Sequence, residues 1–326
     1  MKRVAIIGAG IGGLTLARAL YGAAEITAFE KGRGVGGRTA SRREGHFQFD
    51  HGAQCFTIRT EAFARWIAPM QEAGVVAEWK GPVVNLEAGR VTGPRLWSER
   101  HFVGAPAMNA LARHLADGLD IRAGTDVLPL EPGGGAHMLR DADGRDLGSF
   151  DIVVSTTTPH QTAALFAKLA PGLGFYAGQM KASHALMLGY DRALPIDWIA
   201  AKVMDGPIRW ISVDSSKPGR PAGSTTLVAH TRSGFSRHHL DTPPGLLAPI
   251  LFEAMRAAIP GGLGTPDMIR SHRWRSAIVR RTGRPGPWHD AQMGLAATGD
   301  WAASSRIEEV CLAALDLAAQ LRAELG

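Results

Sequence analysis

Cysteine is scarce in this chain, which contains only Cys55 and Cys311 among its 326 residues. Two cysteines cannot build a disulfide framework, and neither stands at metal-ligand spacing, so we expect a reducing cytoplasm and no metal site. No segment reaches about 18 uninterrupted apolar residues, which argues against a membrane span. Arg18 interrupts the apolar run that follows the first residues, so the sequence does not predict an export signal.

The sequence also lacks the signatures of hydrolases and of nucleic-acid-binding proteins. It shows no nucleophile elbow and no pair of acidic residues that would indicate hydrolysis. No basic run is interleaved with aromatic residues, and no zinc-finger or RNA-binding motif is present. The formal charge of +6 and the pI of about 9.7 come mostly from arginine, which suits anionic ligands such as nucleotide phosphates. We therefore expect no nucleic-acid partner.

What the chain does contain is a glycine-rich turn at its start. Residues 3–7 form a short apolar run, as a buried parallel strand would, and Gly8, Gly10 and Gly13 follow in the spacing G-x-G-x-x-G. This spacing predicts a tight turn, a close approach to a pyrophosphate and close packing of the next helix. Glu30 ends a second apolar strand, where a ribose-binding carboxylate belongs, and an acid there disfavours the 2′-phosphate of NADP.

A second glycine-rich turn follows directly. After Glu30 come Gly34, Gly36, Gly37 and Arg38. Paired glycines allow the chain to run beside a long ligand, and a guanidinium can reach phosphate or flavin oxygens. NAD requires only the first turn, whereas FAD extends onward beneath the next loop. Two such turns therefore favour FAD.

Longer segments carry a family resemblance. "EKGRGVGGR" looks like the double-glycine segment of flavin-containing amine oxidases and their relatives, and "FDHGAQCFT" (residues 49–57) is similar to a segment of renalase-type flavoproteins. "GTDVLPL", "DIVVSTTTPHQTAALF", "WISVDSSKPGRP" and "LVAHTRSGFSRHHLD" extend the resemblance over most of the chain. It implies that FAD passes beside residues 49–57 and that Val127 lies against the adenine.

The end of the chain carries a matching motif. In related flavoproteins, a Gly-Asp pair like Gly299-Asp300 contacts the ribityl chain, and the helix that follows, about residues 305–325 here, points its positive end at the flavin. Motifs and resemblance together predict a noncovalent FAD site. Its expected residues are Gly8, Gly10, Ile11, Gly13, Glu30, Lys31, Gly36, Gly37, Arg38, Gly52, Ala53, Gln54, Val127, Thr156, Gly299, Asp300, Arg306 and Ile307.

The chain departs from the family at three places. Relatives have Glu-Gly-Ala where residues 308–310 read Glu-Glu-Val, so Glu309 brings bulk and charge to the turn. If Glu309 faces the ring it opposes an anionic reduced flavin, and if it faces solvent nothing follows. Relatives also tend to have Pro-x-Trp where residues 182–184 read Ala-Ser-His, and an aromatic residue where Ser276 stands.

The predicted fold class is α/β, with a Rossmann-type FAD-binding domain and an α+β substrate domain built on a mainly antiparallel sheet, as in amine oxidases. Motifs at both ends imply a discontinuous FAD domain of residues 1–60, 100–165 and 275–326. Residues 61–99 and 166–274 would form the substrate domain, with strand-like segments such as "HALMLGYD" and "STTLVAHT".

No catalytic residue is identified by the sequence alone. Aromatic residues and histidines that could line a substrate pocket between the domains are Phe56, His184, His230, Trp274, Trp288 and Trp301, although each is of a type that also serves in a protein core. A group of six arginines could bind an anionic substrate or form a solvated basic edge: Arg270, Arg273, Arg275, Arg280, Arg281 and Arg284.

The resemblance implies an FAD-dependent oxidoreductase like bacterial renalase, which oxidises misreduced isomers of dihydronicotinamide cofactors and passes electrons to molecular oxygen. A dihydropyridine releases hydride to flavin N5 without a strong enzyme base, and none is evident here. Two alternatives stay open. One is an oxidase of a small primary or secondary amine, and the other is a noncatalytic FAD-binding protein.

Overall fold

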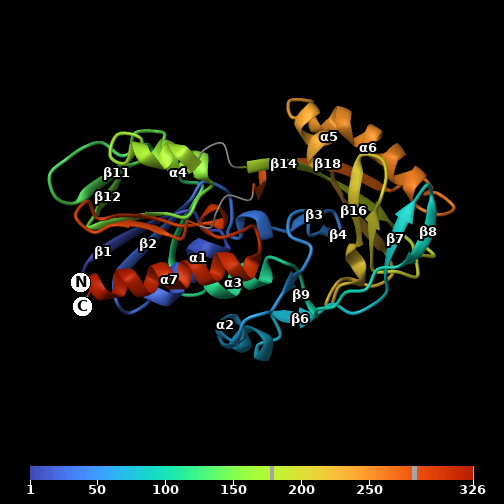
Figure 1. Cartoon of the computed structure of the whole chain (residues 1–326), viewed down its shortest axis with the longest axis horizontal. Helices are drawn as coiled ribbons and strands as arrows, with labels where there is room; N and C mark the ends of the chain where they lie inside the picture. Colours follow the sequence, from blue (N-terminus) through green and yellow to red (C-terminus); the bar gives the residue numbers. More distant parts are fainter. Residues whose placement is uncertain (177–179, 281–284, 326) are drawn as a thin grey trace.

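A computed structural model of the chain describes residues 1–176, 180–280 and 285–325. Two large sheets stand at opposite ends of an elongated molecule, with smaller elements between them (Figure 1). The two termini lie close together at the end that holds the first sheet (Figure 1).

The first sheet has six strands and is parallel except at one edge. Its strands, in spatial order, are β10 (Asp120–Ala123), β2 (Glu25–Glu30), β1 (Arg3–Ile7), β13 (Ile152–Ser155), β20 (Leu295–Ala297) and the antiparallel edge strand β19 (Trp288–Asp290). The central strands β1 and β13 are apolar along almost their whole length because both faces of the sheet are covered.

Helices cover one face of this sheet, and a helix and a hairpin cover the other (Figure 1). On the first face lie α1 (Ile11–Leu20), α3 (Ala110–Ala116) and α7 (Ile307–Leu325), and on the second lie α4 (Pro159–Leu165), β11 (His137–Arg140) and β12 (Asp146–Phe150). The helix α7 packs along α1, so the end of the chain rests on its beginning.

The second sheet has seven strands and is antiparallel except where β15 meets β7. In spatial order the strands are β18 (Met268–Val279), β14 (Met180–Tyr190), β17 (Thr225–Thr231), β16 (Ile208–Val213), β15 (Ala200–Val203), β7 (Val83–Glu87) and β8 (Arg90–Pro94). Two helices, α5 (Ser233–His238) and α6 (Pro244–Ala258), lie beside it, and α6 packs on Leu186 and Leu188 of β14.

Smaller elements join the two sheets. The helix α2 (Glu61–Glu72) and the three-stranded sheet of β5 (Phe56–Thr57), β9 (His101–Gly104) and β6 (Val76–Glu78) share one hydrophobic core with α1 and α3. The hairpin of β3 (Arg42–Glu44) and β4 (Phe47–Phe49) places Phe47 and Phe49 against Met187 and Val228 of the second sheet. This face of the second sheet is opposite to the one that α6 covers, because side chains alternate along β14.

The predicted fold class is confirmed: a Rossmann-type sheet is combined with a mainly antiparallel one. The strands of the first sheet all fall within the segments predicted for the FAD domain, while the domain boundaries themselves stay predictions. Among the described helices, none has both the length and the apolar composition that crossing a bilayer requires.

Candidate functional site

The two glycine turns touch each other. Gly8, at a φ of +106°, follows β1, and the amide of Gly36 donates to the carbonyl of Ala9 at 2.8 Å. A side chain at Gly13 would place its Cβ 2.0 Å from the Gly8 oxygen, so only glycine lets α1 pack this closely. By contrast, a Cβ added at Gly10 would meet no atom within 4 Å. The turns thus form one glycine surface with open space in front of Gly10, as a pyrophosphate requires.

Glu30 lies at the edge of this surface. Its carboxylate accepts the amide of Ala9 at 2.9 Å and that of Gly32 at 2.7 Å. A carboxylate oxygen can accept more than one hydrogen bond, so this arrangement leaves capacity for ribose hydroxyls. Lys31 pairs with Asp126 at 2.7 Å on the surface, next to the half-buried Val127.

Arg38 of the second turn forms an ion pair with Asp300 near the end of the chain. The Nη1 to Oδ2 distance is 2.5 Å, and the hydroxyl of Ser305 donates to the same oxygen at 2.8 Å. The Asp300 side chain is 1% exposed, whereas that of Arg38 is 34% exposed. Two motifs 262 residues apart therefore meet through one buried carboxylate.

Three buried polar atoms without partners in the described part of the chain belong to residues 298–304, the segment that contains this carboxylate. Oδ1 of Asp300 and the hydroxyls of Thr298 and Ser304 have no hydrogen-bond partner among the described residues. Native proteins rarely leave such atoms unmatched unless a ligand, ion or water completes them. The residues present therefore fit FAD: hydroxyls of a ribityl chain and phosphate oxygens would supply the missing partners.

The remaining predicted cofactor residues surround these. Thr156 donates to the Gly8 carbonyl at 2.8 Å, and the amide of Ala53 donates to the carbonyl of Arg38 at 2.9 Å. Ile307 is buried at the start of α7, while Arg306 is exposed. The side chain of Gln54 is buried and forms its hydrogen bonds within the protein.

A row of ring side chains lies on the face of the second sheet that meets residues 51–54. In the register of the strands, His272, Ala185, His230 and Trp210 stand directly opposite one another across β18, β14, β17 and β16. The carbonyl of His51 accepts Nε2 of His230 at 3.1 Å and Nε1 of Trp274 at 2.9 Å. The predicted pocket residues His230 and Trp274 are thus brought together, and His51 and His272 join them.

The histidines of this face are neutral near pH 7. Burial lowers the pKa of His51 to about 3 and the pKa values of His230 and His272 to about 4. The ring of His51 stacks on Trp274 with centroids 5.1 Å apart, and its Nδ1 is buried without a partner among the described residues. This surface offers aromatic rings and neutral imidazoles to a ligand.

The other predicted pocket residues lie elsewhere. His184 stands on the opposite face of β14, the face that carries Leu186 and Leu188 toward α6, because its side chain alternates with that of Ala185. Phe56 is a core residue between Phe63 and Phe102. Trp288 and Trp301 belong to the core above the first sheet. The geometry does not gather these four with His230 and Trp274.

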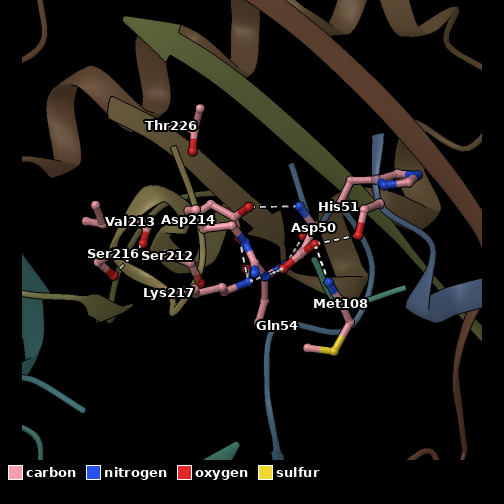
Figure 2. A network of polar contacts seen from close by, with 12 residues as sticks. Asp50, His51, Gln54, Met108, Ser212, Val213, Asp214, Ser216, Lys217 and Thr226 are labelled. Carbon is pink, nitrogen blue, oxygen red and sulfur yellow. Dashed lines mark hydrogen bonds and ion pairs between the residues drawn. The ribbon is translucent and has the colours of Figure 1, made fainter. Parts of the chain in front are cut away.

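A buried ion cluster is a feature that the sequence did not reveal. It consists of Asp50, Asp214, Lys217 and Arg220, whose side chains are all 1% exposed or less. Figure 2 shows the first three of these residues. The first residue belongs to the loop after β4, and the others follow β16. Lysine and aspartate three residues apart in "DSSK" were a possible signal, but such spacing is common on solvated surfaces.

Three tryptophans adjoin this cluster and were also missed. Nζ of Lys217 lies 5.4 Å from the ring centroid of Trp79, and Trp79 meets Trp97 at 5.7 Å. Trp97 in turn lies nearly parallel to Trp210, with centroids 6.1 Å apart and an interplanar angle of 9°. The aromatic face of the second sheet therefore continues to the ion cluster, and a cation already occupies its edge.

The acidic turn at the start of α7 contains two carboxylates that differ in burial. Glu308 is the buried residue, with 3% exposure, and its carboxylate accepts hydrogen bonds from Arg59 and Thr60. Glu309 is half-buried, and its charge acts on Arg59: the hydrogen bond that Arg59 donates to the Glu99 carboxylate raises the pKa of Arg59, and the charges of Glu99, Glu308 and Glu309 act in the same direction.

The arginine group behaves as separate surface residues where it is described. Arg273 donates to the Leu240 carbonyl at 2.7 Å, Arg275 pairs with Asp241 at 2.9 Å, and Arg270 lies 4.0 Å from Glu44. Arg280 is exposed, and Arg281 and Arg284 lie outside the described residues. These contacts favour the solvated basic edge over a single anion site.

Comparison with known proteins agrees with this architecture. The family model of an NAD(P)-binding Rossmann-like domain matches residues 6–68, which contain both glycine turns.

Solved structures match along the whole length. A provisionally assigned protoporphyrinogen oxidase from Exiguobacterium sp. 255-15 is 16% identical, with a TM-score of 0.80. Putrescine oxidase with bound putrescine is 11% identical (TM-score 0.77), and cyclohexylamine oxidase from Brevibacterium oxydans IH-35A is 13% identical (TM-score 0.76). Each comparison covers 99% of this chain and 99% of the other. At such identities the likeness establishes the fold and not the reaction: the chain has the fold of these oxidases, and its residues 6–68 match the model of a Rossmann-like domain.

Proposed function

We propose that the protein is an FAD-dependent oxidoreductase. The observation that carries this proposal is the Arg38–Asp300 ion pair, with the partnerless Oδ1 of Asp300 beside the glycine turns. A dinucleotide that binds only at the first turn would give these polar atoms no hydrogen-bond partner. The likeness to solved oxidases over the whole chain supports the same assignment.

The chain's residues have separate tasks in this site. Gly8, Gly10 and the start of α1 would hold the pyrophosphate, and Glu30 the ribose. Asp300, Thr298 and Arg38 would hold the ribityl region and its neighbouring oxygens. When bound, the flavin supplies a hydride acceptor and can return the electrons to molecular oxygen.

Noncovalent binding is supported by the state of Cys55, which directly follows the loop of residues 50–54. Burial raises the pKa of the Cys55 thiol to about 11, so the thiol stays protonated and is a poor nucleophile at neutral pH.

For the substrate we propose a small, reduced, ring-shaped hydride donor such as a dihydronicotinamide isomer. A planar ring can stack on the surface of Trp274, His230 and Trp210. The histidines His51 and His230 are neutral near pH 7, so this surface suits an uncharged ring. A hydride donor of this kind also needs no strong base from the protein.

Amine oxidation is the second candidate. The solved putrescine and cyclohexylamine oxidases share the fold, which favours an amine substrate.

The test is purification without added cofactor, a visible spectrum, and anaerobic mixing with dihydronicotinamide isomers and with amines. We expect a yellow protein that is bleached by the isomers and recovers its colour in oxygen. Bleaching by amines alone would support the second candidate. A flavin that can be neither reduced nor reoxidised would indicate a noncatalytic FAD-binding protein, and a colourless protein that binds no added FAD would overturn the proposal.

A substitution locates the site. Asp300→Asn should weaken FAD binding by tenfold or more, because a hydrogen bond to a charged partner contributes about 1.5–3 kcal/mol. Asp267→Asn is the control, since Asp267 accepts the amide of Asp191 on the surface of the second sheet.

A further inference from the structure

The buried ion cluster balances its own charge. Nζ of Lys217 lies 2.5 Å from Oδ1 of Asp214 and 3.1 Å from Oδ2 of Asp50, and Nη2 of Arg220 lies 2.5 Å from the same Asp50 oxygen. The Asp50 amide donates to Oδ2 of Asp214 at 2.9 Å. Two acids and two bases are therefore matched, and they tie the loop at Asp50 to the segment that follows β16.

Gln54 connects this cluster to the loop of residues 50–54. Its Oε1 accepts Nζ of Lys217 at 3.5 Å (Figure 2). Its Nε2 donates to the carbonyl of Asp50 and, at 3.2 Å, to that of Gly52. The amide nitrogen of Gln54 therefore holds the loop closed. The ammonium of Lys217 binds the amide oxygen and so fixes the orientation of the carboxamide.

The loop of residues 50–54 in turn packs against Arg38 of the predicted FAD site. A Cβ at Gly52 would lie 2.0 Å from the Arg38 carbonyl and 3.4 Å from Trp274, and the amide of Ala53 donates to that same carbonyl at 2.9 Å. Arg38 holds Asp300 at 2.5 Å. Contacts therefore run without a break from Lys217 through Gln54 and the loop to the carboxylate of the FAD site.

We propose that Lys217 and Gln54 are positioning residues that set the affinity for FAD from the second sheet, by locking the loop of residues 50–54 against Arg38. The inference rests on the proposed function. Neither side chain contacts the cofactor in this role. The carboxamide nitrogen of Gln54 donates to carbonyls of the loop, and the ammonium of Lys217 binds the carboxylates of Asp50 and Asp214.

The first test compares two buried glutamines. Gln54→Leu keeps the size of the side chain and removes the loop contacts without changing any charge. Gln48→Leu is its match, because Gln48 is 8% exposed against 9% for Gln54 and donates to the Pro106 carbonyl at 2.6 Å, outside this loop. We expect FAD to bind Gln54→Leu about tenfold more weakly, or ~1.4 kcal/mol, and Gln48→Leu within twofold of the wild type.

The second test removes the lysine without leaving a buried charge. Asp214→Asn with Lys217→Met deletes one charge of each sign and keeps the Arg220–Asp50 pair, which avoids the loss of folding that an unmatched buried acid would cause. Glu253→Gln with Arg256→Met, a surface pair on α6, is the control. We expect weaker FAD binding only in the buried double variant.

Binding is measured by fluorescence titration of the apoprotein, together with its thermal unfolding and the visible circular dichroism of the saturated flavin. Weaker binding and an altered flavin band, with apoprotein melting like that of the matched control, support the proposal. Unchanged FAD affinity in Gln54→Leu overturns it, and so does weaker binding that merely parallels lower melting temperatures in both glutamine variants. A wild-type protein that binds no FAD overturns the proposed function as well.

Discussion

At the scale of single residues, His184 is a buried imidazole whose ring nitrogens form no hydrogen bond with the described residues. Its exposed fraction is 0%. Burial lowers its pKa to about 4, with the charge of Arg273 acting in the same direction. A buried polar group in this state destabilises the fold, since water is lost and nothing replaces it.

We expect His184→Met to raise the free energy of unfolding by about 1 kcal/mol and to leave FAD affinity unchanged. The apolar side chain of similar volume has no polar atoms to desolvate. Urea denaturation of the apoprotein and FAD titration measure the two quantities. His230→Met is the matched variant and should be destabilised, because Nε2 of His230 donates to His51. Weaker FAD binding by His184→Met would contradict the conclusion that His184 lies outside the functional site.

The two histidines also mark the limit of sequence reasoning. His184 and His230 look alike in the sequence, as single histidines in strand-like segments, and only the register of β14 and β17 shows that they occupy opposite faces. Gly13 and Glu30 could be predicted because a nucleotide turn constrains residues at short, fixed spacings. Asp300 could be predicted only because the Gly299-Asp300 pair resembles one in related flavoproteins. Contacts between Lys217 and Gln54, by contrast, depend on how two distant segments pack, and no spacing encodes that.

At the scale of elements, the first turn of α7 holds the start of α2. Thr60 is the N-cap of α2, and its side chain accepts the amide of Phe63 at 3.2 Å. The Glu308 carboxylate accepts the Thr60 amide at 2.7 Å, the Thr60 hydroxyl at 2.8 Å and the Arg59 amide at 3.1 Å. A carboxylate at a helix N-terminus also interacts favourably with the positive end of the helix dipole. The sequence directed attention to Glu309, one residue away from the group that forms these contacts.

We expect Glu308→Ala to lower the free energy of unfolding by about 2–3 kcal/mol, since it removes the charged acceptor of the Arg59 and Thr60 amides and of the Thr60 hydroxyl. Glu308→Gln should fall between the wild type and this variant because its amide oxygen still accepts. Glu309→Gln, at a half-buried position in the same turn, is the control and should change stability by less than about 1 kcal/mol. Equal losses for Glu308→Ala and Glu309→Gln in urea denaturation would contradict the capping role.

At the scale of the whole molecule, buried ionisable groups concentrate where the two sheets are joined. His51, the ion cluster and the row from His230 to His272 all lie between the Rossmann-type sheet and the second sheet. Burial opposes the charge on Asp50, but Lys217 and Arg220 outweigh it and hold the pKa of Asp50 well below its usual range. The junction that would shape the substrate site is thus also the part of the fold most sensitive to pH.

The buried histidines fix the direction of that sensitivity. The pKa is about 3 for His51 and about 4 for His184 and His230 in the folded protein, against 6.5 ordinarily. Between pH 6.5 and 4 the unfolded chain binds protons that the folded chain does not bind, so these histidines lower the free energy of unfolding progressively as the pH falls below 6.5. Each contributes a slope of up to about 1.4 kcal/mol per pH unit. Burial raises the pKa of Asp214, which acts in the opposite direction.

A comparison of two proteins isolates the histidine contribution from that of Asp214. We expect the free energy of unfolding of the apoprotein to fall between pH 7 and pH 5, and to fall less steeply in His184→Met, by about 1.4 kcal/mol per pH unit well below pH 6.5. Urea titrations at half-unit steps give the slope, with the denaturant dependence checked for constancy. His46→Met is the control, since His46 is exposed beside Asp191. Identical pH slopes in the wild type and His184→Met would show that His184 is not held neutral by burial.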